Sequence, residues 1–152
     1  MQQYCIMQFV RHSIQILRAK GYKITQPRRR VLMVLERVEN PLSPYEIQKL
    51  LQEEGKYLDP VTIYRILDLF CSLNLVHKVW SLGGFMRCTL GDEGGCHRYM
   101  VCRNCGDLQE FADKLLCHKE DEVAEKFGFY TEYHVTEFSG LCSQCHEMNK
   151  GC

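Results

Sequence analysis

Two Cys-x-x-Cys pairs constrain this chain more than any other feature of its sequence. Cys102 and Cys105 form the first pair, and Cys142 and Cys145 form the second. Four thiolates in this arrangement make a closed tetrahedral zinc site, which leaves no position for water or substrate. Such spacing fits zinc better than it fits two disulfides or two redox dithiols. We therefore expect a structural zinc that joins the two ends of a folded segment in the C-terminal third.

The composition indicates a folded protein of a reducing compartment. Hydrophobic residues make up 45% of the 152 residues, a content typical of folded rather than disordered chains. The N-terminus lacks the basic and apolar regions of a signal peptide, and no stretch is long enough to span a membrane. We expect a cytoplasmic protein, whose ten cysteines serve as metal ligands or free thiols.

Charge divides the chain into a basic and an acidic part. Residues 1–88 contain 13 lysines and arginines against 7 aspartates and glutamates, whereas residues 89–152 contain 6 against 12. A basic half favours a polyanionic partner such as nucleic acid. The two parts are therefore expected to have different roles.

Helix signals in the basic half predict a winged helix-turn-helix. A first helix is expected between Ser13 and Gly21, from the spacing of its apolar residues. Three further helices each begin at a capping residue with a proline in the first turn: Thr25 with Pro27, Ser43 with Pro44, and Asp59 with Pro60. Two β-prone runs, 76–80 and 85–90, surround a glycine turn and predict a hairpin, the wing. In this fold the helix after Asp59 enters the major groove of DNA.

Candidate contacts with DNA lie on the polar sides of these helices. Thr62, Tyr64 and Arg65 belong to the helix after Asp59, and the forked donors of Arg65 suit a guanine edge. Arg28 and Tyr45, near the starts of the two preceding helices, are candidates for phosphate or thymine methyl contacts. Taken alone, each of these side chains fits an ordinary solvent-exposed residue as well as it fits a DNA contact. Their shared context favours DNA binding.

The acidic half is expected to form a small α/β unit. Its pattern predicts strands around Met100, over 108–111 and over 129–135, with a helix that carries Leu115 and ends before Gly128. The predicted fold class is thus α+β: a winged helix-turn-helix domain followed by a small α/β domain with a four-cysteine zinc site.

Four motifs resemble the ferric uptake regulator family of bacterial metal-dependent repressors. They are ITQPR at 24–28, PVTIYR at 60–65, YMVCRNCG at 99–106 and GLCSQC at 140–145. The first exchanges proline and glutamine relative to the family's T-P-Q-R. The resemblance covers nearly the whole chain. It implies a homodimer on double-stranded operator DNA, with a DNA-binding domain over 1–88, a hinge over 89–95, and a dimerisation and metal-binding domain over 96–152.

The resemblance also implies a regulatory metal at the hinge. His77 and Cys88 lie in the two arms of the wing. A turn centred between residues 82 and 83 puts them directly opposite, with Cβ atoms about 5 Å apart, whereas a turn at 83–84 makes them diagonal neighbours on one face. His97 and Glu110 flank the first cysteine pair on neighbouring strands. A His/Cys/His/Glu set suits zinc better than iron.

This ligand set resembles the zinc uptake regulator branch of the family. The likeness implies a zinc-responsive repressor of zinc uptake genes that binds palindromic operators, with one structural and one regulatory zinc per protomer. Iron and peroxide branches place a histidine just before the helix at Ser43, where this chain has Pro41 and Leu42. An iron- or peroxide-responsive regulator is the alternative.

Two ligand questions stay open in the sequence. The third regulatory ligand is either His97 or Cys96. His134 stands where the family sometimes has an additional ligand, but its usual partners are missing, so it is left out of the predicted sites. The other cysteines show no informative spacing: Cys5, Cys71, Cys117 and Cys152.

No sequence pattern favours an enzyme. The chain has no HExxH motif, no H-x-E paired with P-C-x-x-C, and no Cys-x-x-Cys at the start of a βαβ unit. We therefore expect neither catalysis nor a small-molecule substrate, and no membrane partner. A zinc-stabilised interaction module without DNA binding is the remaining class to distinguish.

Overall fold

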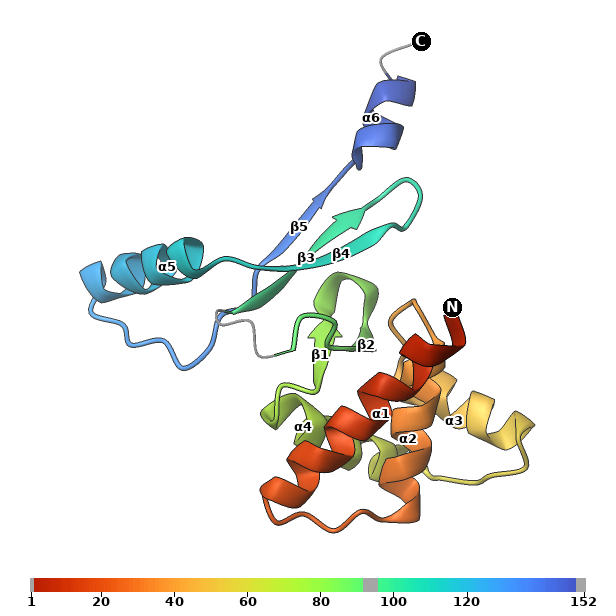
Figure 1. The fold of residues 1–152 in the computed structure, drawn as a ribbon. Coiled ribbons are helices and arrows are strands. Elements are labelled where there is room, and N and C mark those ends of the chain that lie inside the picture. The colour runs from red at the N-terminus through yellow and green to blue at the C-terminus, as the bar shows by residue number, and fades with distance from the viewer. Residues whose placement is uncertain (1, 92–95, 150–152) are drawn as a thin grey trace. The chain divides into compact units, whose positions relative to one another are not determined.

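The computed structural model describes residues 2–91 and 96–149 and divides the chain into two compact units, Met1–Cys88 and Thr89–Cys152 (Figure 1). The expected hinge over 89–95 falls partly outside the described residues, and Cys152 falls outside them entirely. Both helices and sheets are present, and the predicted α+β class is confirmed. Within the described ranges, none of the helices is long and apolar enough to cross a membrane.

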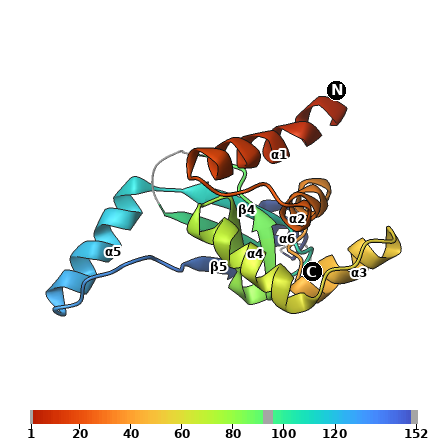
Figure 2. The same ribbon diagram turned by 90° about the horizontal axis from the view of Figure 1, so that it is seen from below.

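Four helices make up most of the first unit: α1 (Gln2–Ala19), α2 (Gln26–Arg37), α3 (Pro44–Glu53) and α4 (Pro60–Ser72). In Figure 2, α2 is seen nearly end-on while α1 and α4 lie across the view, so these helices cross rather than run parallel. The side chains of Thr25, Ser43 and Asp59 each accept a hydrogen bond from the backbone N–H three residues later. Each bond satisfies a donor that has no partner inside the helix. The predicted starts of α2, α3 and α4 are therefore confirmed.

The first helix differs from the prediction. It begins at Gln2 rather than at Ser13. Ser13 is a fully buried mid-helix residue and not a cap. Phe9 and Val10 also pack against the core, so the apolar stripe of the helix extends one turn or more before Ser13.

One hydrophobic core fills the first unit. Its fully buried side chains come from all four helices and include Leu17, Leu32, Ile47 and Phe70. Helix α4 contributes Ile63, Ile66, Leu67 and Phe70 to this core. Because those residues occupy one side of α4, its other side faces solvent.

A two-stranded hairpin completes the first unit. Strands β1 (Val76–Val79) and β2 (Gly84–Arg87) pair antiparallel with His77 opposite Met86, and the short 3-10 helix η1 (Trp80–Leu82) and Gly83 connect them. His77 and Cys88 therefore lie diagonally on the same face. The predicted placement of these two residues directly opposite each other is wrong, because the turn is centred neither between residues 82 and 83 nor at 83–84. It instead spans four residues, ending at Gly83 with φ of 64°.

The second unit is built on a three-stranded sheet. Strand β3 (His97–Cys102) lies between β4 (Leu108–Ala112), which is antiparallel to it, and β5 (Glu137–Gly140), which is parallel. Helix α5 (Lys114–Lys126) connects β4 to the long segment before β5, and α6 (Ser143–Asn149) follows the second cysteine pair (Figure 1).

The predicted strand over 129–135 is wrong. That segment forms no strand, and β5 begins only at Glu137. Alternating aromatic residues suggested a strand, yet Phe129, Tyr130 and Tyr133 are exposed. Strand formation requires a pairing partner, and the ladder with β3 begins only at the Tyr99–Glu137 pair and runs to the Cys102–Gly140 pair. This register brings the second cysteine pair back to the first.

The core of the second unit is small. Among its described residues, the buried hydrophobic ones are Tyr99, Val101, Cys102 and Cys145. No described residue of α5 is fully buried. The largest fully buried side chain is that of a charged residue, Arg98. Apolar packing within this unit thus supplies much less stabilisation than the core of the first unit.

Candidate metal centres and nucleic-acid interface

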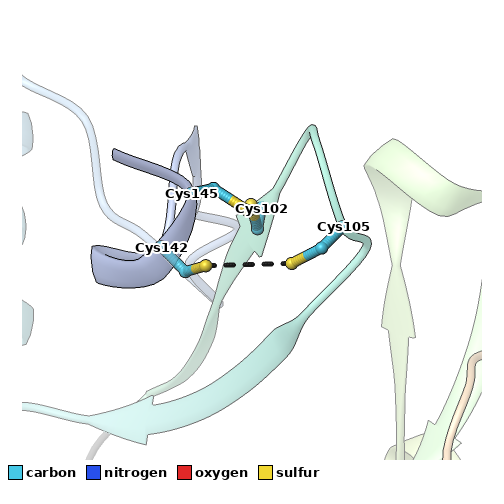
Figure 3. Close-up of side chains that lie close together, drawn as sticks. All are labelled: Cys102, Cys105, Cys142 and Cys145. Carbon is cyan, nitrogen blue, oxygen red and sulfur yellow. Dashed lines mark hydrogen bonds between the residues drawn. The ribbon is translucent and has the colours of Figure 1, made fainter. Parts of the chain in front are cut away.

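The four cysteines of the two Cys-x-x-Cys pairs converge in the second unit. Their sulfur atoms all lie within 4.8 Å of one another, and Cys105 Sγ is 3.8 Å from Cys142 Sγ (Figure 3). A tetrahedral zinc with Zn–S bonds of about 2.3 Å requires sulfurs roughly 3.8 Å apart. The geometry fits a four-cysteine zinc site. One ion would then bind cysteines from two segments that lie far apart in the sequence of this unit.

Backbone hydrogen bonds hold these cysteines in position. Gly106 N donates to Cys102 O at 2.9 Å, and a φ of 76° at this glycine allows the tight turn. The backbone N–H groups of Cys105 and Cys142 donate to the Cys102 sulfur and lower the pKa of this thiol to about 6. Because the thiolate is the form that binds metal, these bonds prepare Cys102 as a ligand.

The four expected regulatory ligands fall into two pairs, one in each unit. In the first unit, His77 and Cys88 share a face of the hairpin, and Cys88 N donates to Leu75 O at 2.9 Å. In the second unit, His97 Nδ1 lies 2.9 Å from Glu110 Oε1, and both side chains are less than a tenth exposed. Each pair consists of residue types that commonly bind zinc.

Cys96 and His97 point to different partners. His97 contacts Glu110, whereas Cys96 Sγ lies 3.5 Å from His134 Nδ1. Successive residues of an extended strand face opposite sides, which explains the difference. The geometry within this unit therefore favours His97 over Cys96 as the partner of Glu110.

A third cluster was missed in the sequence. Cys96, Cys117 and His134 each offer one ligand atom, and these atoms lie within 4.8 Å of one another. Strand alternation could have separated Cys96 from His97. No local pattern, however, brings Cys117 of α5 and His134 of the following segment together, because that meeting depends on the tertiary fold.

The candidate DNA contacts all lie in the first unit. Some of their side chains are exposed, and others form hydrogen bonds within the protein. Tyr64 and Arg65 are exposed on α4, and Tyr45 is exposed at the start of α3. The hydroxyl of Thr62 donates to the Asp59 carboxylate at 2.6 Å and so belongs to the helix cap. Arg28 Nη1 donates to the backbone carbonyl of residue 23 at 2.5 Å.

Four crossing helices with a hairpin, followed by an α/β unit with clustered metal ligands, define a metal-responsive DNA-binding regulator of the winged-helix type. The chain matches the Ferric uptake regulator family over residues 19–139 and belongs to that family. Members of this family are transcription regulators and not enzymes.

Relatives named for iron and for zinc both resemble the chain. The ferric uptake regulation protein of Legionella pneumophila is 35% identical over 132 residues, which cover 86% of this chain and 96% of the relative. The zinc uptake regulation protein of Escherichia coli K12 is 28% identical over 149 residues, which cover 97% and 87%. A solved structure of a zinc uptake regulator complexed with zinc and DNA has a TM-score of 0.85 at 27% identity and covers 97% of this chain and 98% of its own.

Proposed function

We propose that this chain is a zinc-responsive transcriptional repressor that binds palindromic operator DNA as a homodimer and controls zinc uptake genes. The observation that carries the proposal is the donor set. His77 and Cys88 share a hairpin face, and His97 contacts Glu110 at 2.9 Å. A thiolate among nitrogen and oxygen donors favours zinc over iron(II).

The proposed protomer holds one structural and one regulatory zinc at these sites. Cys102, Cys105, Cys142 and Cys145 hold the structural ion, and the 3.8 Å separation of two of their sulfurs supports this assignment. His77, Cys88, His97 and Glu110 hold the regulatory ion. His97 is preferred to Cys96 as the third ligand because Cys96 contacts His134 instead.

The proposed mechanism is a coupling between zinc binding and the arrangement of the two units. One ion bound by ligands from both units favours the arrangement in which both hold it. Shifting such an equilibrium from mostly open to mostly closed requires about 5.5 kcal/mol of differential affinity. One zinc that gains a second pair of ligands only in the closed arrangement can supply this difference. Zinc would thereby set the two DNA-binding units of a dimer at a fixed half-site spacing.

Helix α4 is the proposed recognition element. Its buried face is anchored by Ile63, Ile66, Leu67 and Phe70, while Tyr64 and Arg65 are exposed. Arg65 is proposed to read a guanine edge, with Arg28, Tyr45, Thr62 and Tyr64 as further contacts. The positive balance of residues 1–88 supports binding to the phosphate backbone.

Exposed apolar side chains of the second unit support homodimerisation. They include some of the largest exposed hydrophobic residues of the chain: Leu115, Phe127, Phe129, Tyr130 and Tyr133. Several large exposed apolar side chains in one small unit are consistent with a protein interface there. A twofold dimer would match the symmetry of a palindrome.

An iron-responsive regulator is the second candidate, because the Legionella relative at 35% identity is a ferric uptake regulation protein. The two candidates differ in their dependence on Cys88. Iron(II) sensing by nitrogen and oxygen donors has no need of this thiol.

Selection from random duplexes tests both candidates with the full chain. Binding is compared without metal, with buffered zinc and with iron(II), and native mass spectrometry counts the metal per protomer. We expect zinc-dependent binding, and one exchangeable zinc fewer in Cys88→Ser than in the unsubstituted chain. Cys71→Ser, another cysteine of the first unit, should behave as the unsubstituted chain does. Binding activated by iron(II) and retained in Cys88→Ser would instead establish the iron-responsive reading.

A further inference from the structure

A side chain in the first cysteine pair reaches across the four-cysteine site to the second pair. Asn104 Nδ2 donates a hydrogen bond to Cys145 Sγ at 3.2 Å, although the two residues are 41 positions apart. We propose that this bond holds Cys145 as a zinc-bound thiolate, so that the exposed Cys105 is the ligand that leaves the zinc first. Asn104 would thus be a positioning residue for the structural zinc. The inference rests on the proposed function, because that function assigns zinc to these cysteines.

The sulfur atoms of the site accept hydrogen bonds from two kinds of donor. Cys102 accepts from the backbone N–H groups of Cys105 and Cys142. Cys105 accepts from the backbone N–H of Asp107. Every residue except proline supplies such a donor, so most substitutions leave it in place. The donor to Cys145 is instead a side-chain amide, and this contact therefore depends on the identity of one side chain.

The charge of the site makes this donor important. Four thiolates around one Zn²⁺ leave an excess of negative charge. Cys145 is only 5% exposed, so water can offset little of the charge on its sulfur. A hydrogen bond to a charged acceptor is stronger than one between neutral groups. The Asn104 amide therefore stabilises the Cys145 thiolate and lowers its reactivity as a nucleophile.

The four sulfurs also differ in their accessibility. Cys102 and Cys145 are buried, whereas Cys105 is exposed. In Figure 3, Cys105 faces Cys142, and their sulfurs lie 3.8 Å apart. Solvent access to a metal site is controlled by the groups around its ligands. Because Asn104 holds the buried Cys145, the site is expected to open at Cys105.

The competing explanation is that the tight turn of the first pair places the amide beside the sulfur without any effect on the metal. Gln144 occupies the equivalent position in the second pair, directly before its last cysteine, and is exposed. Among the described residues, the amide of the first pair donates to a cysteine sulfur and that of the second does not. Gln144→Glu therefore adds a charge beside a zinc ligand without removing a hydrogen bond. It is the matched control for Asn104→Asp.

The test measures how fast N-ethylmaleimide labels each cysteine of the zinc-loaded full chain, by mass spectrometry of proteolytic fragments. In the unsubstituted chain, Cys105 should be labelled before Cys145. Asn104→Asp replaces the donor with a negative charge and should raise the labelling rate of Cys145 about 10-fold. Asn104→Ala, which adds no charge, should raise this rate in the same direction. Gln144→Glu should leave it nearly unchanged.

A purely structural role of Asn104 would expose all four cysteines alike. Equal increases at all four, or equal Cys145 rates in Asn104→Asp and Gln144→Glu, would overturn the proposal. Native mass spectrometry of Cys142→Ser checks the zinc site itself and should count at least one zinc fewer than in the unsubstituted chain. An unchanged count would refute the zinc assignment and the inference with it. A lower count, together with unaffected labelling of Cys145 in the Asn104 variants, would refute the inference alone.

Discussion

Arg87 connects the wing to the end of helix α2. Its Nη1 atom lies 3.2, 2.5 and 2.9 Å from the backbone carbonyl oxygens of Leu35, Glu36 and Val38. Carbonyls at a helix C-terminus have no partner inside the helix, and a cation there also interacts favourably with the helix dipole. Arg87 precedes Cys88, so the same side chain fixes the strand that carries a proposed zinc ligand.

Replacing this arginine should destabilise the first unit. Arg87→Met removes the donors and leaves part-buried carbonyls unsatisfied, which we expect to cost about 2 kcal/mol. Urea unfolding followed by the fluorescence of Trp80, the one tryptophan of the chain, measures the change. Arg65→Met, on the exposed side of α4, is the matched control and should leave the midpoint unchanged. Equal midpoints for both variants would show that Arg87 adds no net stability.

At the scale of elements, the hairpin is positioned by a close approach to the segment between α2 and α3. Leu42 and Phe85 exchange two backbone hydrogen bonds of 2.9 and 2.8 Å. Gly84 lies beside this bridge, and a Cβ atom there would be 2.8 Å from the Pro41 backbone carbon. The glycine is therefore required for space, and not only for the turn.

Gly84→Ala should consequently displace strand β2. Overpacking of this kind typically costs about 1–3 kcal/mol. The expected result is a lower urea midpoint in the Trp80 signal, together with weaker zinc-dependent DNA binding because Cys88 follows the displaced strand. Leu82→Ala, which shortens an exposed side chain of the same hairpin, should change neither property. A stable Gly84→Ala variant would mean that the Pro41 segment moves aside at little cost.

At the scale of the whole molecule, the two units are stabilised by different means. The core of buried apolar residues lies within the first unit, from Leu17 to Phe85. The second unit combines a small core with clustered metal ligands. Structural zinc sites contribute on the order of 10 kcal/mol or more to the folding of small domains. The second unit is therefore expected to depend on metal and the first to be independent of it.

Loss of the structural zinc should unfold one unit and spare the other. In Cys142→Ser, amide hydrogen exchange should become rapid in β3 and β4, because the ligand set is incomplete, while α2 and α4 stay protected. Cys71→Ser should retain protection in both units. The exchange of each segment is measured by mass spectrometry of proteolytic fragments. Persistent protection of β3 in zinc-free Cys142→Ser would show that packing alone holds the second unit.

The sequence by itself determined the features that depend on residues close together in the chain. Thr25, Ser43 and Asp59 cap their helices through hydrogen bonds that reach only three residues ahead. The starts of these helices could therefore be predicted from the sequence. The Cys-x-x-Cys spacing likewise carries the geometry of its two metal ligands locally. The motifs around these features were sufficient to predict the family and the fold class.

Only the tertiary structure decided how distant segments meet. The four-residue turn fixed His77 opposite Met86 and made Cys88 its diagonal neighbour. The parallel pairing of β5 with β3 placed the last strand at Glu137 and left the aromatic segment before it unpaired with the sheet. Cys96 and His134, 38 residues apart, meet because α5 and the following segment return to the start of β3. Such contacts depend on long-range packing, for which a sequence pattern of short period carries no signal.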